Sequence, residues 1–279
     1  MTQYSLAQLT VLEASPPELI KIAAHAGYDL VGLRLLEVTG GDAWPLTTDK
    51  HLRRSTKEAL RYFGLGVLDV ELVRLTPDVD VSTLRPTIEV AADLGARHIL
   101  TQAHDDEWGR LCDNFDRLCD LLAGYGLTAD LEFLTWTKMK GVNDVLRLLE
   151  KVDKTNVGVT VDTLHFYRSG CLLDDLQRVP PELLHFVQVS DAPACAPSST
   201  EGLIRAARGE RLNPGEGELD LLGLFRTLPE NIPVAVEIPN TGLASRMPVE
   251  QRVRDALDAT KALVASARRV QSSSISPVQ

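Results

Sequence analysis

Several features that define common protein classes are scarce in this sequence. Four cysteines occur in 279 residues and none forms a C-x-x-C pair, so neither a disulfide scaffold nor a cysteine metal site is indicated. Cys112 and Cys119 are seven residues apart, on one face of an expected helix, and we expect them to pack in the core. The formal net charge of −10 argues against a nucleic acid or an anionic membrane as partner.

Other absences narrow the fold and the compartment. No apolar run approaches the ~20 residues of a membrane-spanning helix, and the N-terminus lacks a basic region followed by an apolar stretch. We therefore expect a cytoplasmic protein. No G-x-G-x-x-G motif follows the first strand-like segment, which argues against a dinucleotide-binding doubly wound sheet. With 44% hydrophobic residues, the chain is too apolar to be disordered.

Strand-like and helical patterns alternate along the chain. A helical segment begins with a capping box, Ser15 to Glu18, and ends at Gly27. Eight apolar or β-branched segments separated by helical patterns predict an α/β protein with a single (β/α)8 TIM barrel over residues 1–268, followed by a disordered tail, 269–279. An open sheet is the alternative. The expected strands are 4–11, 29–36, 65–75, 97–102, 127–133, 156–162, 184–190 and 233–239.

Polar side chains stand near the ends of the last four expected strands: Glu132, Asp162, Gln188 and Glu237. A charge buried at the end of a core strand is costly unless something compensates it. Four converging oxygen donors are what a hard divalent cation needs. The sequence therefore predicts one divalent metal at this end of the barrel, with Mg²⁺ or Mn²⁺ favoured and Co²⁺ or Zn²⁺ as alternatives.

The order of the motifs resembles the xylose-isomerase-like sugar phosphate isomerase/epimerase superfamily. Glu132 is followed by a D-x-x-H motif at 162–165, by R-x-x-P-G-E-G at 211–217 and by Glu237. The resemblance implies that Glu132, Asp162, Gln188 and Glu237 bind the metal, and that Glu132 and Glu237 exchange protons with the substrate. It also implies that His165 and Arg211 contact substrate oxygens, with His165 a candidate base.

Gln188 departs from this family, which more often has histidine at that position. The segment Q-V-S-D-A-P, 188–193, is similar to bacterial 3-dehydroshikimate dehydratases, which share the barrel and also place glutamine on the metal. Arg74 and Trp136 fit the same comparison. In those enzymes an arginine binds the substrate carboxylate, a role for which Arg74 and Arg211 are candidates here.

The residues leave several alternatives open. Arg34 and Arg74 either bind substrate or form ion pairs at the barrel rim, and Glu71 points either into the barrel or to solvent. Asp191 either orients Gln188 or pairs with Arg211. The P-G-E-G segment is either a turn or a set of amides that binds an anion. The long loop, 192–218, after the seventh strand is expected to cover the substrate.

The expected function is a metal-dependent isomerase or epimerase that acts on a small polyhydroxylated ketone, sugar or sugar phosphate through proton abstraction next to a carbonyl. The alternative is a lyase resembling 3-dehydroshikimate dehydratase that forms protocatechuate. A DNA-repair endonuclease of the same barrel type is disfavoured by the acidic charge and the six histidines. A non-catalytic sugar-acid-binding barrel is disfavoured because all four ligand positions carry donors. The partner is a small molecule, and we expect a homodimer or homotetramer.

Overall fold

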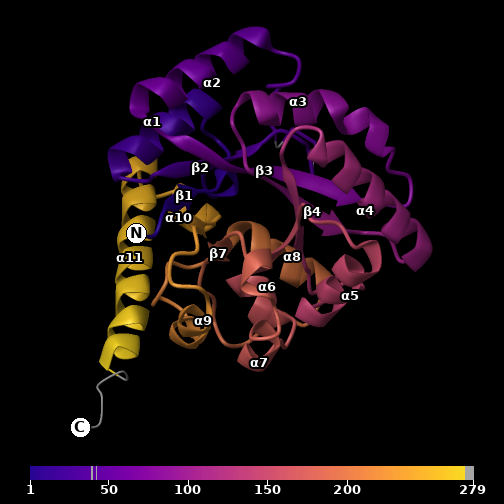
Figure 1. The fold of residues 1–279 in the computed structure, drawn as a ribbon. Helices are drawn as coiled ribbons and strands as arrows, with labels where there is room; N and C mark the ends of the chain where they lie inside the picture. Colours follow the sequence, from indigo (N-terminus) through magenta and orange to yellow (C-terminus); the bar gives the residue numbers. More distant parts are fainter. Residues whose placement is uncertain (39, 42, 274–279) are drawn as a thin grey trace.

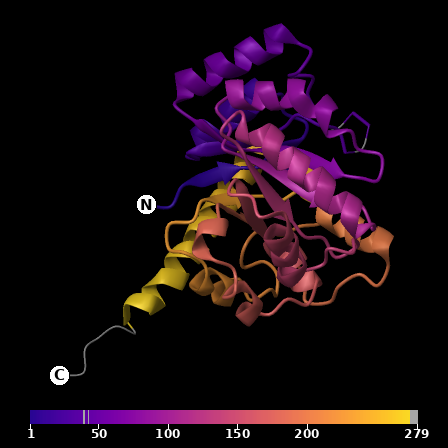
Figure 2. The ribbon, with the colours of Figure 1, turned by 45° about the vertical axis from the view of Figure 1, so that its right-hand side comes forward.

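The computed structural model describes residues 1–38, 40–41 and 43–273, and it shows a closed barrel of eight parallel strands in sequential order, β1 to β8. Helices surround the barrel (Figures 1 and 2). This confirms the predicted (β/α)8 architecture. The strands are β1 (Tyr4–Leu6), β2 (Leu30–Arg34), β3 (Gly66–Leu75), β4 (His98–Ala103), β5 (Thr128–Glu132), β6 (Val157–Asp162), β7 (Val187–Val189) and β8 (Val234–Val236).

The helices follow the strands along the chain. The α-helices are α1 (Pro16–Ala26), α2 (Lys50–Phe63), α3 (Arg85–Asp93), α4 (Trp108–Ala123), α5 (Val142–Val152), α6 (Thr163–Arg168), α7 (Leu173–Leu176), α8 (Thr200–Gly209), α9 (Leu221–Thr227), α10 (Thr241–Ala244) and α11 (Val249–Ser273). Short 3₁₀ helices are η1 (Gln8–Val11), η2 (Val81–Leu84) and η3 (Pro181–Leu183). None of the described helices is both long and apolar enough to cross a membrane.

Local sequence explains the first helix. The side chain of Ser15 and the carboxylate of Glu18 form the predicted capping box, which satisfies amides that would otherwise lack partners at the helix start. Gly27 ends the helix with φ of 94°, a left-handed conformation that glycine adopts without the steric cost of a Cβ. In α4, Cys112 and Cys119 are both buried, as expected.

Side chains alternate between the two faces of each strand. Outward residues such as Leu131 and Val161 join the large apolar core between barrel and helices. A smaller interior cluster includes Leu68, Leu100 and Phe186. Above this apolar layer the inward positions become polar, and that change places Glu132 and Asp162 inside the barrel mouth.

Some expected boundaries were wrong. The first strand ends at Leu6, because the chain turns into η1 at Gln8–Val11 rather than continuing to residue 11. The segment 192–218 contains the ten-residue helix α8, so it is not the irregular loop we expected. Helix α11 extends to Ser273, past the expected domain boundary, and residues 274–279 of the expected tail lie outside the described residues.

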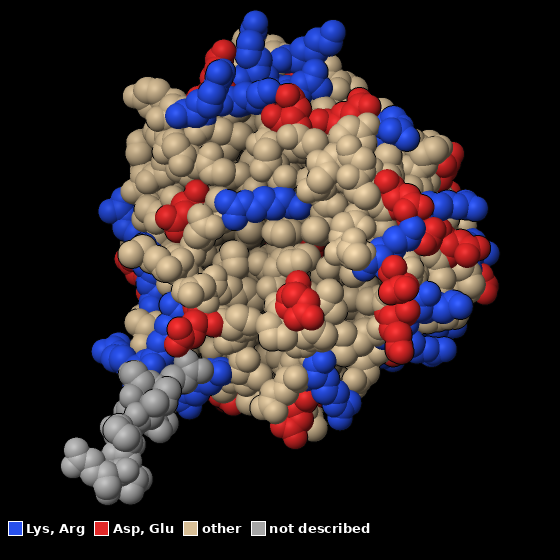
Figure 3. Space-filling view, in the orientation of Figure 1, with Lys and Arg blue, Asp and Glu red and all other residues tan. Residues whose placement is uncertain are grey.

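Charge is mixed on the face shown in Figure 3. Basic side chains gather at the top of this face, basic and acidic side chains are mixed along its right margin, and most of its centre is uncharged.

Candidate active site

The four predicted ligand residues meet at the carboxyl-terminal end of the barrel. Glu132 and Asp162 are the last residues of β5 and β6, Gln188 lies in β7, and Glu237 follows β8. Asp162 pairs in register with Gln188, so their side chains stand next to each other on the inner face. All four are buried, with at most 3% of the residue exposed. This end of the barrel is where TIM-barrel enzymes carry their active sites.

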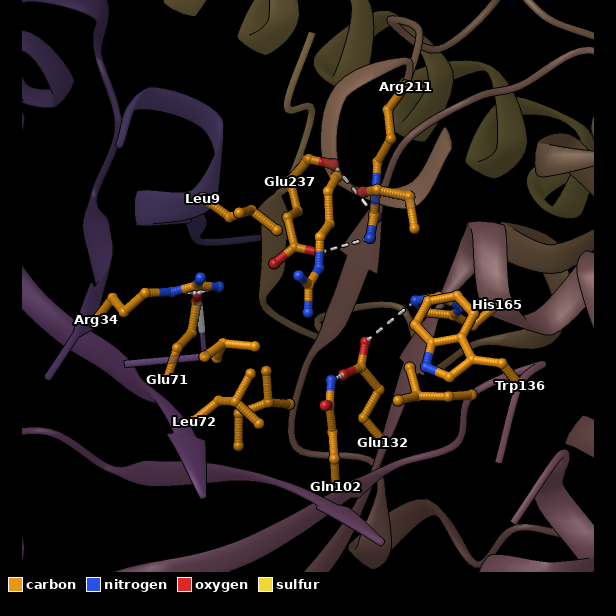
Figure 4. A pocket seen from close by; sticks show the side chains of 15 residues that line it. Leu9, Arg34, Glu71, Leu72, Gln102, Glu132, Trp136, His165, Arg211 and Glu237 are labelled. Atoms are coloured by element: carbon orange, nitrogen blue, oxygen red, sulfur yellow. Dashed lines mark hydrogen bonds and ion pairs between the residues drawn. The ribbon is translucent and has the colours of Figure 1, made fainter. Parts of the chain in front are cut away.

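Arg211 connects three of these residues. Its Nη1 donates to Asp162 Oδ2 at 2.5 Å, and its Nη2 lies 3.0 Å from Glu237 Oε2. Gln188 Nε2 in turn donates to Glu237 Oε1 at 3.0 Å. Arg211 as a whole is only 2% exposed, and its Nε donates to the carbonyl of Ala207 near the end of α8. Arg211 therefore neutralises part of a buried acidic cluster (Figure 4).

Glu132 and His165 form the other half of the site. His165 Nε2 lies 3.9 Å from Glu132 Oε1, and Trp136 packs edge-on against the His165 ring with centroids 5.0 Å apart. Gln102 of β4 donates a short hydrogen bond to Glu132 Oε2. His165 is held in place because Asp162 Oδ1 accepts its backbone amide at 3.0 Å, as the N-cap of α6. Figure 4 shows Glu132, His165 and Trp136 along one wall of the pocket.

The buried carboxylates carry more negative charge than Arg211 neutralises. Burial, together with the charge of Asp162, raises the pKa of Glu132 to about 8. Burial also raises the pKa of Glu237 well above its usual value, although Arg211 opposes this. For Asp162, burial would raise the pKa, but Arg211 and His165 lower it overall. Without a further cation, Glu132 and Glu237 are therefore favoured in their protonated forms.

These residues fit a divalent cation. Glu132, Asp162 and His165 offer ligand atoms that all lie within 4.8 Å of one another. The amide oxygen of Gln188 is buried and has no hydrogen-bond partner among the described residues. An orphaned carbonyl-type oxygen beside carboxylates with raised pKa values is what a hard cation would satisfy. Glu237 is not part of that group of ligand atoms. It and Gln188 are linked to Asp162 through Arg211, whose guanidinium lies between Asp162 and Glu237.

The pocket that these residues help to line has arginines, glutamates and apolar side chains in its walls. Arg34 of β2 and Arg208 of α8 line it, as do Leu72, Leu134 and Trp136. Arg34 donates to Glu71 Oε2 from Nε at 3.0 Å and from Nη2 at 2.7 Å. Glu71 thus points into the barrel, and Arg34 forms an ion pair there.

Arg74 is placed differently. It is not among the pocket-lining residues, and its Nη2 lies 3.4 Å from His104 Nδ1, whose ring reaches Gln102 Oε1 at 3.2 Å. Arg74 is the register partner of Gln102 on the neighbouring strand, after a register shift between Val70 and Val73.

Backbone amides in and after the P-G-E-G segment bind a carboxylate of the protein itself, that of Asp191. Asp191 Oδ2 accepts the amides of Gly215 at 2.9 Å and Gly217 at 3.1 Å, and Oδ1 accepts Leu219 at 3.2 Å. A Cβ on Gly217 would lie 2.3 Å from Asp191 Oδ1, so only glycine allows this approach. Asp191 thus anchors the loop after Arg211, a role that neither expectation for this residue included.

Sequence reasoning did not find Gln102 or Arg208. Gln102 is the next-to-last residue of β4 and the last residue of the expected strand 97–102, so its position near a strand end was a usable signal. Arg208 had no signal, because its position depends on α8, a helix inside a segment that we expected to be irregular.

Comparison with known proteins identifies the family of this chain. The family model described as xylose isomerase-like TIM barrel matches residues 20–263. The chain therefore belongs to the xylose isomerase-like TIM-barrel family, as the motifs predicted.

Curated relatives match over part of the chain. A 3-dehydroshikimate dehydratase of Pseudomonas aeruginosa is 27% identical over 136 residues, which are 47% of this chain and 21% of that protein. An inosose dehydratase of Halalkalibacterium halodurans is 30% identical over 131 residues, 44% of this chain and 43% of that protein. The matched segments thus cover less than half the length of either relative.

Solved structures share the fold over the whole chain. The IolI protein, crystallised with a bound zinc atom, superposes with a TM-score of 0.77 at 18% identity and covers 95% of this chain and 99% of its own. An L-ribulose 3-epimerase superposes with a TM-score of 0.73 at 15% identity and covers 100% of both chains. At these identities the likeness concerns the fold.

Proposed function

We propose that this protein is a divalent-metal-dependent dehydratase that eliminates water from a small polyhydroxylated ketone, with 3-dehydroshikimate as the first substrate to test and protocatechuate as its product. One observation carries the proposal: the buried imidazole of His165 faces a ring of carboxylates that fits a cation. Two curated relatives that differ in substrate are both named as dehydratases, and Gln188 matches the metal-site glutamine that the sequence resemblance implies.

Glu132, Asp162, Gln188 and Glu237 would hold the cation. Their donors are all oxygens, a set that favours Mg²⁺ or Mn²⁺ over Zn²⁺. When bound, such a cation supplies positive charge that polarises the substrate carbonyl and makes the neighbouring carbon more acidic. Gln102 orients Glu132 through its hydrogen bond, and Arg211 orients Asp162 and Glu237.

His165 would take the proton from the carbon next to the carbonyl. Burial lowers the pKa of His165 to about 4, so its imidazole is neutral at pH 7 and able to accept a proton. The electron pair of the broken C–H bond forms the new C=C bond, and the hydroxyl on the adjacent carbon leaves with its own pair. That hydroxide and one proton give water, so one water is lost for each turnover.

An arginine of the pocket lining would bind the substrate's anionic group. Arg211 is already occupied by two carboxylates, and Arg74 lies outside the pocket lining. Arg208 and Arg34 do line it, so we propose that Arg208 recognises the substrate carboxylate from α8. This moves the carboxylate-binding role from Arg74 and Arg211, where the sequence placed it.

Isomerisation or epimerisation is the second candidate. Glu132 of β5 and Glu237 after β8 lie on opposite sides of the pocket (Figure 4). This placement suits one residue that takes a proton from one face of a carbon and another that gives a proton to the opposite face. Such an enzyme would return the proton to carbon instead of expelling the hydroxyl.

The two candidates separate in one set of assays. Mn²⁺-loaded protein incubated with 3-dehydroshikimate should produce the absorbance of an aromatic product, and EDTA should abolish it. His165→Asn should lower kcat by about 10²–10⁴-fold and keep Mn²⁺ affinity. Trp108→Phe, outside the pocket, is the control. The epimerase proposal would replace the dehydratase proposal under two results: no product forms from 3-dehydroshikimate or an inosose, and deuterium from solvent exchanges into a ketose.

A further inference from the structure

A second cluster of metal-ligating side chains lies at the opposite end of the barrel. His98 is the first residue of β4, His185 precedes β7, and Asp130 stands in β5 between them. Asp130 is two residues before Glu132 on the same strand, which separates the two clusters by roughly 7 Å along it. Asp130 is fully buried, whereas the side chains of His98 and His185 are 13% and 22% exposed.

The three side chains converge on a small volume. His185 Nδ1 lies 2.7 Å from Asp130 Oδ1, and His98 Nδ1 lies 3.4 Å from Asp130 Oδ2. One ligand atom from each residue can be chosen so that all three lie within 4.8 Å of one another. The two imidazole rings are stacked, with centroids 4.8 Å apart and an interplanar angle of 16°. Both rings therefore present the same nitrogen to one carboxylate.

Glycine on the neighbouring strand makes room for this arrangement. A Cβ at Gly158 of β6 would lie 2.2 Å from Asp130 Oδ1 and 2.5 Å from His185 Nδ1. Any other residue would push the carboxylate and the ring apart. The Asp130–His185 contact thus depends on a missing side chain at 158, which is how a preformed polar site is built into a barrel interior.

Other polar groups lie on the strands around this cluster. Asp69 of β3 is in register with His98, is 1% exposed, and neither of its carboxylate oxygens has a hydrogen-bond partner among the described residues. Thr128 Oγ1 lies 2.8 Å from His98 Nδ1, and the His185 ring has a backbone hydrogen bond with Glu182. Metal-binding histidines are commonly oriented by such backbone partners.

Hydrogen bonds already join the same atoms in the metal-free chain: Thr128 Oγ1 donates to Asp130 Oδ2 and lies 2.8 Å from His98 Nδ1, and His185 Nδ1 lies 2.7 Å from Asp130 Oδ1. A cation bound here would take up the Nδ1 atoms of both histidines and an oxygen of Asp130. Two imidazoles and a carboxylate suit a borderline metal such as Zn²⁺, in contrast to the oxygen-only set at the barrel mouth.

We propose that His98, His185 and Asp130 form a second divalent-cation site at the amino-terminal end of the barrel, selective for Zn²⁺ over Mg²⁺ and Mn²⁺. The site joins β4, β5 and the start of β7, so its role is to stabilise barrel closure. The proposal does not depend on the function assigned to the mouth.

The test removes the mouth site first. The full chain carrying Glu132→Gln and Glu237→Gln is titrated with Zn²⁺ by calorimetry and with Co²⁺ by visible absorption. We expect one ion per chain, with the intense visible bands of tetrahedral Co²⁺. Adding His98→Gln and His185→Gln should weaken binding at least about 100-fold. Adding His25→Gln and His51→Gln, on exposed helix positions, should leave it unchanged and serves as the matched control.

Two results would overturn the proposal: no Zn²⁺ bound by the mouth-silenced chain, or equal binding after both site histidines are replaced. If the histidine variants fold poorly by circular dichroism, the wild-type chain decides the question. Histidine ring-nitrogen NMR on adding one and two equivalents of Zn²⁺ should then shift the Nδ1 resonances of His98 and His185. Unmoved resonances at two equivalents would contradict the site without any substitution.

Discussion

Arg211 Nη1 donates to Asp162 Oδ2 at 2.5 Å, which places a buried guanidinium on one of the carboxylates proposed to hold the catalytic cation. Because the same arginine also reaches Glu237, it and a divalent cation would neutralise the same charges. The stability of the site should therefore depend on which cations are present.

Arg211→Met should lower the free energy of unfolding of the metal-free protein by about 3–5 kcal/mol, because it leaves buried carboxylates without a partner. Saturating Mn²⁺ should recover more stability in this variant than in the wild type. Urea denaturation with EDTA and with Mn²⁺ measures both. Arg110→Met, which removes a partly exposed ion pair with Asp105, should cost no more than about 1 kcal/mol. An equal loss for Arg211→Met in both buffers would contradict a shared set of carboxylates.

Gln188→His should change the preferred metal. An imidazole in place of an amide oxygen favours borderline cations, so the ratio of Zn²⁺ to Mn²⁺ affinity should rise by roughly tenfold or more. Competitive calorimetry with the two ions measures the ratio. Gln188→Glu keeps an oxygen donor and should retain the wild-type order of preference. If Gln188→His left the ratio unchanged, Gln188 would not be a ligand.

Gly158→Ala should destabilise the barrel. Its new Cβ would lie 2.2 Å from Asp130 Oδ1, inside a buried and hydrogen-bonded cluster, so we expect a loss of about 1–3 kcal/mol or more in the free energy of unfolding. Gly124→Ala is the matched control, because its Cβ would meet Leu121 O at an ordinary 3.5 Å and its φ of −61° suits alanine. Equal stability of the two variants in urea would show that the structure has room for a Cβ at residue 158.

The metal-free protein should lose stability in acid through Asp130. Burial would raise the pKa of Asp130, but hydrogen bonds from His185 and His98 outweigh it and lower the pKa from 3.8 to about 2. A lowered folded-state pKa means that the ionised carboxylate stabilises the fold fully above about pH 4 and loses this effect as the pH falls toward 2.

Between pH 5 and pH 2 the wild type in EDTA should therefore lose roughly 2 kcal/mol more than Asp130→Asn. Urea denaturation at each pH measures the difference. Asp113→Asn, on the exposed side of α4, should follow the wild-type curve. Parallel curves for the wild type and Asp130→Asn would show that Asp130 is protonated equally easily in the folded and unfolded chain.

The fold was readable from the sequence because each strand has a strong local pattern. Eight apolar segments and the capping box at Ser15–Glu18 specify elements that local chemistry determines, and the structure confirms them. The end of β1 and the start of β7 were not readable, since apolar residues adjoin the strands there: Ala7 follows Leu6, and Phe186 precedes Val187. Helix α8 was not readable either, because its apolar residues pack against residues of neighbouring loops.

The sequence predicted those residues of the site that lie at or near the ends of strands. The convergence of Glu132, Asp162, Gln188 and Glu237 follows from parallel strands ending on one face. The partner of Arg211 did not follow, because an arginine in a loop of unknown path has several carboxylates within reach. Nor did the cluster at Asp130, since His98 and His185 sit at strand beginnings, and only the barrel's closure brings β4 near β7.

Asp162 performs two tasks with its two oxygen atoms: Oδ1 begins the helix that carries His165, and Oδ2 faces Arg211. The orientation of the proposed base is thus tied to the charge state of the barrel mouth. A change that pulls this carboxylate aside would also loosen the first turn of α6. Damage to the cation site and damage to proton transfer should accordingly occur together, as a single event.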